Sequence, residues 1–197
     1  MLCLCGTRVI CLALQTDIML KNLAMYKEAV GDRIQVIWIS GTDFGTQNAP
    51  FLARDAFVQL YKPYYKRIND WIHKNTGWKT LYHSCGAVFE LIPDFIDMGV
   101  DILNPVQCSA VGMDANTLKR TFGDKIVFWG GGINTQQTLP YGSVDEVRQE
   151  TIERINTFSP NGGFVFATVH NIVAKTPAEN IVAMFDAFNE FRNRVYT

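Results

Sequence analysis

The fold is decided by one stretch of the chain, KTLYHSCGAVFELIPDFIDMGVDILNPV (residues 79–106). Both of its ends are nearly continuous apolar runs, and a helix-like segment that ends in Gly99 lies between them. Continuous apolar strands are typical of parallel sheets, because both faces of such a sheet are buried. Glycine is also common just after the last turn of a helix. The stretch therefore predicts a β-α-β unit with parallel strands.

The same alternation extends in both directions from this unit. Further strand-like runs occur at 33–40, 125–131 and 162–168, and amphipathic segments separate them. Alternation of this kind predicts parallel strands joined by right-handed crossovers. Five such units fit an open doubly wound α/β sheet, and they also fit most of a (β/α)8 TIM-type barrel without its first part. The strand count does not choose between the two.

Local signals place the helices. The segment 53–77 has an apolar stripe that Pro63 should bend or divide. Ser143 precedes Glu146 by three residues, which is the pattern of a capping box. Thr176 and Pro177 predict the N-cap and the first residue of the last helix. The buried face of that last helix is expected to consist of Ile181, Met184, Phe185 and Phe188.

Composition and charge narrow the classes of protein to which this chain could belong. The chain has 197 residues and a formal net charge of −1, so no nucleic-acid partner is expected. No apolar run reaches the 18 or so residues of a membrane span. The five cysteines are an odd number that favours reduced thiols in a cytoplasm over a secreted disulfide framework. The apolar N-terminus has no basic segment before it, which argues against a signal peptide.

No linker divides the chain, so we expect one domain over residues 1–197. Residues 18–30 should be helical, whereas residues 1–17 are expected to be a non-native or poorly ordered start. Five βα units without a closed barrel would leave open strand edges and expose interior residues such as Trp38 and Phe166. Self-association through those edges is therefore predicted.

The most informative chemistry is at the ends of the strands, where parallel α/β folds place their active sites. His83 and Cys85 are two residues apart on an extended segment, so their side chains share one face. An imidazole and a thiolate suit zinc, which takes three protein ligands in catalytic sites. His170 is the best candidate for the third ligand, and Cys108 is its rival. The alternative is a packed histidine beside a buried thiol.

Other residues at strand ends could contact a substrate. Asp43 could present a carboxylate to the substrate, or it could serve only as a turn or helix-cap residue. The run Gly130–Gly132 could form an anion nest, although it lacks the pattern of a P-loop. The residues predicted to bind substrate are Phe44, Asn104, Gln107, Trp129, Gly130, Gly131 and Asn134.

Four stretches together resemble the uroporphyrinogen decarboxylase superfamily. They are DRIQVIWISGTDFGTQNAPF (32–51), YKPYYKRINDWIHKNTGWKTLYHSCGAVFELIPDFIDMGVDILNPVQ (61–107), LKRTFGDKIVFWGGGINTQQTLPYGSVDEVR (118–148) and GGFVFATVHNIVAKTPAENIVAMFDAF (162–188). The superfamily also contains corrinoid-dependent methyltransferases, such as methylcobalamin:coenzyme M methyltransferase. The resemblance runs from about Gly31 to the C-terminus, and it implies the last five βα units of a (β/α)8 barrel.

The resemblance also implies a choice between two chemistries. The methyltransferase branch has an H-x-C-G motif that binds zinc, and His83, Cys85 and Gly86 match it. The third zinc ligand in that branch is a cysteine, where this chain has His170, so the sequence departs from the pattern there. The decarboxylases have a histidine at this position and need no metal.

The first hypothesis is therefore zinc-dependent methyl transfer, either thiol methylation or O-demethylation. The methyl group would be exchanged with methylcobalamin on a separate corrinoid protein, and a small molecule would be the other methyl donor or acceptor. The alternatives are a decarboxylase of porphyrin biosynthesis and an inactive fragment or interaction module.

Overall fold

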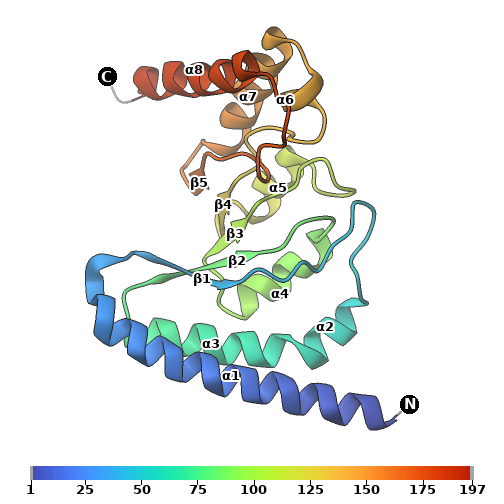
Figure 1. Cartoon of the computed structure of the whole chain (residues 1–197), viewed down its shortest axis with the longest axis vertical. Coiled ribbons are helices and arrows are strands. Elements are labelled where there is room, and N and C mark those ends of the chain that lie inside the picture. Colours follow the sequence, from blue (N-terminus) through green and yellow to red (C-terminus); the bar gives the residue numbers. More distant parts are fainter. Residues whose placement is uncertain (1, 196–197) are drawn as a thin grey trace. The chain divides into compact units, whose positions relative to one another are not determined.

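The computed structural model describes the backbone of residues 2–195 and the side chains of residues 10–193. Helices and strands alternate along the chain (Figure 1). The strands are β1 (Val36–Ser40), β2 (Lys79–His83), β3 (Ile102–Asn104), β4 (Val127–Trp129) and β5 (Phe164–Val165). The helices are α1 (Leu2–Val30), α2 (Arg54–Leu60), α3 (Lys62–Asn75), α4 (Ile92–Asp97), α5 (Ala115–Phe122), α6 (Thr138–Tyr141), α7 (Val144–Phe158) and α8 (Ala178–Val195), with short 3-10 turns at Gly31–Arg33 and Phe89–Leu91.

The strands form one parallel sheet whose order follows the sequence, β1-β2-β3-β4-β5. This confirms the predicted α/β class and the parallel βα repeat. Every strand is shorter than its apolar run: only Phe164 and Val165 of the run 162–168 are paired as β5. Gly162 and Gly163 have φ values of +74° and +69°, which extended strands do not adopt. The glycines therefore delay the start of β5.

The chain divides into two compact units. The first contains residues 1–42, 51–83 and 90–102. In it, β1 pairs with β2 in parallel, and Trp38 lies opposite Leu81 in the register. Aromatic rings fill its core: Tyr82 contacts Tyr65 and Phe95 with ring centroids 5.0 Å apart in both pairs.

The helices of the first unit follow the local signals. The predicted division at Pro63 is confirmed, because α2 ends at Leu60 and α3 begins at Lys62. Asp94 at the start of α4 is buried, and its carboxylate accepts from Arg54 at 2.7 Å and Lys62 at 2.8 Å. A buried carboxylate needs such partners, since desolvating it alone would be costly. This ion cluster fixes α2 and α3 to α4.

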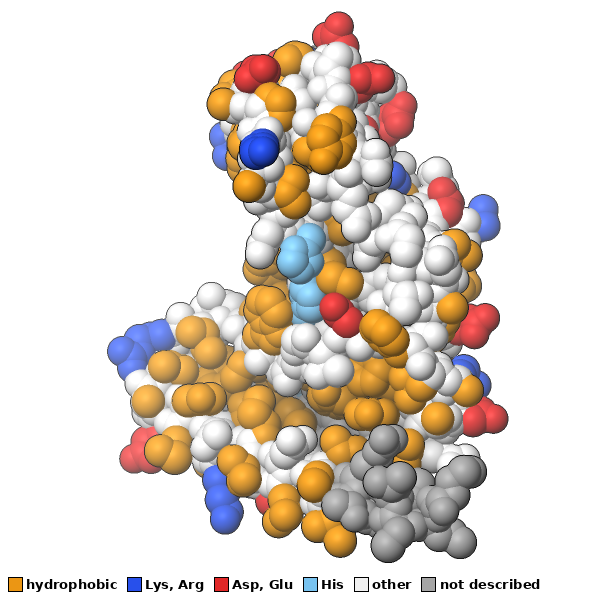
Figure 2. All heavy atoms as spheres, turned by 45° about the vertical axis from the view of Figure 1, so that its right-hand side comes forward, with side chains coloured by type: hydrophobic (Ala, Val, Ile, Leu, Met, Phe, Trp, Pro, Cys, Tyr) orange, Lys and Arg blue, Asp and Glu red, His pale blue; other side chains and the backbone are white. Residues whose placement is uncertain are grey.

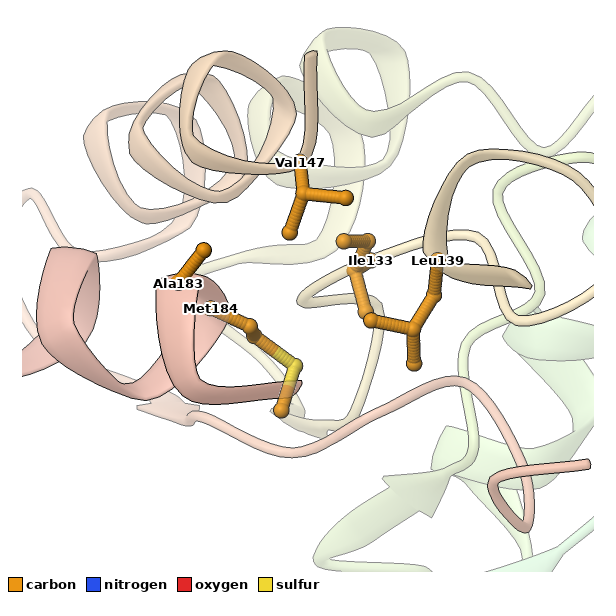
Figure 3. Close-up of a cluster of buried hydrophobic side chains, with 5 residues drawn as sticks. All are labelled: Ile133, Leu139, Val147, Ala183 and Met184. Carbon is orange, nitrogen blue, oxygen red and sulfur yellow. The ribbon is translucent and has the colours of Figure 1, made fainter. Parts of the chain in front are cut away.

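The second unit contains residues 43–50, 84–89 and 103–197. Its core includes a cluster of Ile133, Leu139, Val147, Ala183 and Met184, whose side chains converge from the segment after β4 and from α6, α7 and α8 (Figure 3). The predicted capping box is confirmed at the start of α7. The predicted N-cap of the last helix is wrong: α8 begins at Ala178, and the Thr176 hydroxyl donates backwards to Val173 O at 2.8 Å.

Helix α1 contains the predicted helical segment 18–30 and extends back to Leu2. The side chains of residues 2–9 lie outside the described residues. Among the helices of the described part, none is long and apolar enough to cross a membrane.

Hydrophobic side chains gather in patches on the face shown in Figure 2. On α1, a stripe with helical spacing is exposed: Ile10 (61%), Leu14 (58%), Ile18 (58%) and Met25 (65%). Trp38 on β1 is 58% exposed as expected, but Phe166 is half-buried and stacks on Phe188 at 4.6 Å. Within the sheet, β1 and β5 are the edge strands. Exposed apolar stripes and open edges both favour association with another chain.

We therefore expect the protein to self-associate as its concentration rises. Sedimentation velocity over a dilution series should show a shift to larger species. The double variant Leu14→Glu/Ile18→Glu should reduce this shift by placing charge on the apolar stripe of α1. Gln15→Glu, which adds charge at an exposed polar position of the same helix, is the control. A wild-type chain that stays monomeric throughout would contradict the prediction.

Candidate metal site

The segment after β2 is held to the rest of the second unit through Ser84. Its side chain is 2% exposed, and its hydroxyl oxygen accepts from the Phe44 N–H at 2.8 Å. The Ser84 N–H donates to Asn104 O at 2.8 Å. Neighbouring side chains on an extended segment point to opposite faces. Anchoring Ser84 inward therefore leaves Cys85 on the other face.

Cys85 is half-buried beside Asp43. The Cys85 N–H donates to the Asp43 Oδ1 at 2.7 Å, so this carboxylate holds the backbone of the candidate ligand. Burial, followed by the negative charge of Asp43 and its hydrogen bond, raises the pKa of the Cys85 thiol to about 12. The metal-free thiol is therefore protonated at neutral pH. The contact gives Asp43 a positional task besides the predicted contact with substrate.

Two glycines, Gly45 and Gly86, allow the loop that carries Asp43 to contact the loop that carries Cys85. Gly86 has a φ of +86°, and a Cβ built on it would lie 2.4 Å from both the carbonyl carbon and oxygen of Gly45. A Cβ on Gly45 would lie 2.7 Å from Ala87 N and 2.9 Å from Cys85 O. The two backbones are thus in direct contact, and neither position has space for a side chain.

His170 follows β5 in the second unit. The Thr168 hydroxyl donates to His170 O at 2.7 Å, which shapes the turn that presents the imidazole. The Cys85 Sγ and a ring nitrogen of His170 lie within 4.8 Å of one another. The structure therefore brings together two of the predicted ligands from segments far apart in the sequence.

His83 is the last residue of β2 and belongs to the first unit. Its ring stacks on Trp38, with centroids 5.3 Å apart and planes at 20°. One residue, Ser84, separates it from Cys85 in the chain. Two peptide units span at most about 7 Å between Cα atoms, so the chain itself limits the distance between the His83 and Cys85 Cα atoms.

A cavity of about 280 Å³ in the second unit opens beside Cys85 and His170. Of the seven residues predicted to bind substrate, Gln107 and Asn134 line it and the others do not. Phe44 is 2% exposed, and the Asn104 side-chain amide donates to Trp129 O at 3.0 Å. The complete lining is Cys85, Gln107, Ser109, Asn134, Thr135, Gln136, Val169 and His170.

The interpretation of Gly130–Gly132 as an anion nest is wrong. Their N–H groups donate to backbone carbonyls, from Gly130 to Val165 O at 3.0 Å, from Gly131 to Pro105 O at 2.9 Å and from Gly132 to Ala167 O at 2.9 Å. None of these donors is left for an anion. The run instead packs the end of β4 against the neighbouring loops.

Cys108, the rival third ligand, does not group with Cys85 and His170 among the described residues. Burial raises the pKa of its thiol to about 11. Four residues of the cavity wall were missed by sequence reasoning: Ser109, Thr135, Gln136 and Val169. Thr135 and Gln136 directly follow the predicted residue Asn134, Ser109 lies two positions after Gln107, and Val169 directly precedes His170. Including two positions on either side of each predicted site residue would have found them.

Known proteins similar to this chain were found by family, by sequence and by fold. The family model of uroporphyrinogen decarboxylase (URO-D) matches residues 11–191, which widens the resemblance that began at Gly31. A uroporphyrinogen decarboxylase from Pseudoalteromonas translucida (strain TAC 125) is 27% identical over 96 residues, covering 47% of this chain and 26% of the relative.

A solved structure, a methyltransferase from Methanosarcina mazei, has a similar fold, with a TM-score of 0.61 and 24% identity over 80% of this chain. The chain spans 42% of that structure and 26% of the curated relative, so it is much shorter than both. The family match covers nearly all of the described residues, and the chain belongs to the uroporphyrinogen decarboxylase family.

Proposed function

We propose that the chain carries a catalytic zinc site for methyl transfer to or from a corrinoid protein. The observation that carries this proposal is the approach of the Cys85 Sγ and a His170 ring nitrogen to within 4.8 Å beside a cavity. The reaction would be thiol methylation or O-demethylation.

The donor set suits zinc. A thiolate and imidazoles are ligands that zinc prefers, and their bonds are about 2.3 and 2.0–2.1 Å long. Two atoms on one zinc can thus be at most about 4.4 Å apart, so the observed approach needs little closure. His83 would be the third ligand because only Ser84 separates it from Cys85. Three protein ligands would leave one position for a substrate, as in catalytic zinc sites.

Zinc in such a site supplies a Lewis acid that lowers the proton affinity of a substrate thiol or polarises a methoxyl oxygen. The residues of this chain would hold the ion and orient its ligands. Cys85 and His170 would bind the ion, and Asp43 would hold the Cys85 backbone. The cavity of about 280 Å³ would accept a small molecule. Among its described lining residues there is no Lys or Arg, which favours an uncharged substrate over a polycarboxylate.

The methylcobalamin would be carried by a separate corrinoid protein. The methyltransferase fold neighbour supports this kind of partner. A reducing compartment such as the cytoplasm suits Cys11, Cys85 and Cys108, which form no disulfides. Both units would be parts of one barrel domain, since the family match runs through both.

A decarboxylase is the second candidate, and the curated relative of that name favours it. A non-catalytic interaction module is the third, because the exposed apolar stripe of α1 and the edge strands β1 and β5 could contact another chain. Metal content separates the first two hypotheses, since the decarboxylase reading needs no zinc.

The test begins with elemental analysis of the purified, dialysed protein, for which we expect about one zinc per chain, as a single catalytic site requires. The loaded protein is then mixed with methylcobalamin and a panel of small thiols. Methyl transfer would form a sulfur–carbon bond as the cobalt–carbon bond breaks and leaves its electron pair on cobalt. Mass spectrometry detects the thioether, and the absorption of the corrinoid reports the loss of methyl.

His170→Ala should lower both zinc content and thioether formation, whereas Gln136→Ala, on the same cavity wall, should preserve zinc. A zinc-free protein that releases carbon dioxide from uroporphyrinogen would support the decarboxylase instead. A folded chain with neither zinc nor activity would support the interaction module.

A further inference from the structure

Gln107 connects the loop after β3 to the loop that carries Cys85. Its side chain is 9% exposed, and its Oε1 accepts from the Gly86 N–H at 2.8 Å. A backbone N–H can only donate, so this bond fixes which end of the Gln107 amide faces Gly86.

The other end of the amide is also engaged. The Gln107 Nε2 donates to the Gln47 Oε1 at 2.7 Å, and the Gln47 Nε2 donates to Ser109 O at 2.5 Å. The amides thus form a directed chain of donors and acceptors from Ser109 to Gly86. Because its acceptor and one donor are already used, Gln107 has little capacity left to bind substrate.

The two peptide units on either side of the Cys85 Cα are held by different side chains. Asp43 accepts from the Cys85 N–H at 2.7 Å, and Gln107 accepts from the Gly86 N–H at 2.8 Å. Fixing both peptide planes fixes φ and ψ of Cys85, and therefore the direction of its Cα–Cβ bond. These two hydrogen bonds therefore restrict the direction in which the Cys85 Sγ points.

We infer that Gln107 is a positioning residue that directs the Cys85 thiolate at the metal. The inference rests on the proposed zinc site. Partners of this kind, which do not touch the metal, typically contribute 10–100-fold to affinity when they orient a ligand.

The test uses Co²⁺ as a spectroscopic probe in place of zinc. Thiolate-to-cobalt charge transfer reports the sulfur–metal bond, and the intensity of the ligand-field bands reports tetrahedral geometry. Gln107→Met keeps the size of the side chain but removes the acceptor for Gly86. We expect about 10–100-fold weaker Co²⁺ binding and a weaker charge-transfer band per bound ion.

Two further variants separate positioning from packing. Gln107→Glu retains an oxygen that can accept from the Gly86 N–H, so it should recover most of the band. Gln137→Met changes an exposed amide that does not line the cavity and should leave affinity and spectrum unchanged. If Gln107→Met does not fold, Gln47→Met replaces it, because it removes the partner of the Nε2 from an exposed position. It should cause a smaller loss in the same direction.

The outcomes distinguish this inference from the proposed function. A wild-type chain that binds neither Co²⁺ nor zinc would overturn both. A wild-type chain that binds Co²⁺ with the same affinity and spectrum as the Gln107 variant, or as its Gln47 substitute, would overturn the inference alone. Amide hydrogen exchange of the metal-free protein adds an independent readout, since Gln107→Met should accelerate exchange at Gly86 relative to Gln137→Met.

Discussion

The Cys85→Ser variant is expected to lose its zinc almost completely. Serine has nearly the size of cysteine, but its hydroxyl stays protonated and is a poor zinc ligand. We expect the affinity to fall by more than about 100-fold, beyond the 10–100-fold typical of partners that do not touch the metal. Competition with a chromophoric chelator and elemental analysis after dialysis measure the loss.

Cys108→Ser is the matched control for this variant. Cys108 belongs to the same unit and is also a partly buried thiol, but it does not group with His170. It should therefore retain its zinc. Both variants should keep the circular dichroism of the wild type, since Cys85 is not among the fully buried residues. If Cys85→Ser kept its full zinc content, the metal would be bound elsewhere and the proposed site would be wrong.

The largest loss of stability is expected from Gly130→Ala. A Cβ on Gly130 would lie 2.0 Å from Pro105 O, and the φ of +122° is unfavourable for any side chain. The obstacle is backbone, so it cannot move aside as a flexible side chain would. Overpacking typically costs about 1–3 kcal/mol and a strained φ about as much again, so we expect a decrease of about 3 kcal/mol or more in the free energy of unfolding. Urea denaturation measures it.

Variants at two other glycines separate the cost of the close contact from the cost of the backbone conformation. Gly162 has a φ of +74° with no atom within 4 Å of the added Cβ, so Gly162→Ala reports the cost of the backbone conformation alone. Gly77 has open space and no positive φ, and Gly77→Ala should change stability by less than about 0.5 kcal/mol. If Gly130→Ala were no more destabilising than Gly162→Ala, the close contact with Pro105 would not exist in solution.

The order of elements could be predicted from the sequence because buried strands have a local signature. The apolar runs at 79–85 and 125–131 each contain a strand, and the capping box at Ser143 starts α7 at the expected residue. The paired lengths could not be predicted. They depend on where a neighbouring strand ends and on φ values such as those of Gly162 and Gly163.

Helix α8 shows where periodicity alone misleads. Met184 is buried as predicted, but Phe185 is 48% exposed. Asn180 is instead 2% exposed, because its amide donates to Leu139 O at 3.0 Å and Gly142 O at 2.8 Å around α6. The rotation of the helix follows from this tertiary partner, which no pattern within α8 reveals.

The candidate site, too, could be predicted only in part from the sequence. The rule that side chains meet at the carboxyl ends of parallel strands predicts the approach of His170 to Cys85. The role of Gln107 depends instead on the conformation of three loops, and sequence reasoning assigned it to substrate. Hydrogen bonds to loop backbones have no periodicity, so only the structure reveals them.

The contact between Gly45 and Gly86 has an evolutionary consequence. A side chain that obstructs another side chain can be accommodated by a second substitution, but here each added Cβ would meet main-chain atoms of the opposite loop. No compensating change elsewhere can remove a main-chain atom, so each glycine can mutate only if both loops take a new path. Lineages that keep this path should therefore inherit the two glycines as a pair, and a descendant that has lost one of them should also have abandoned the ligand geometry at Cys85.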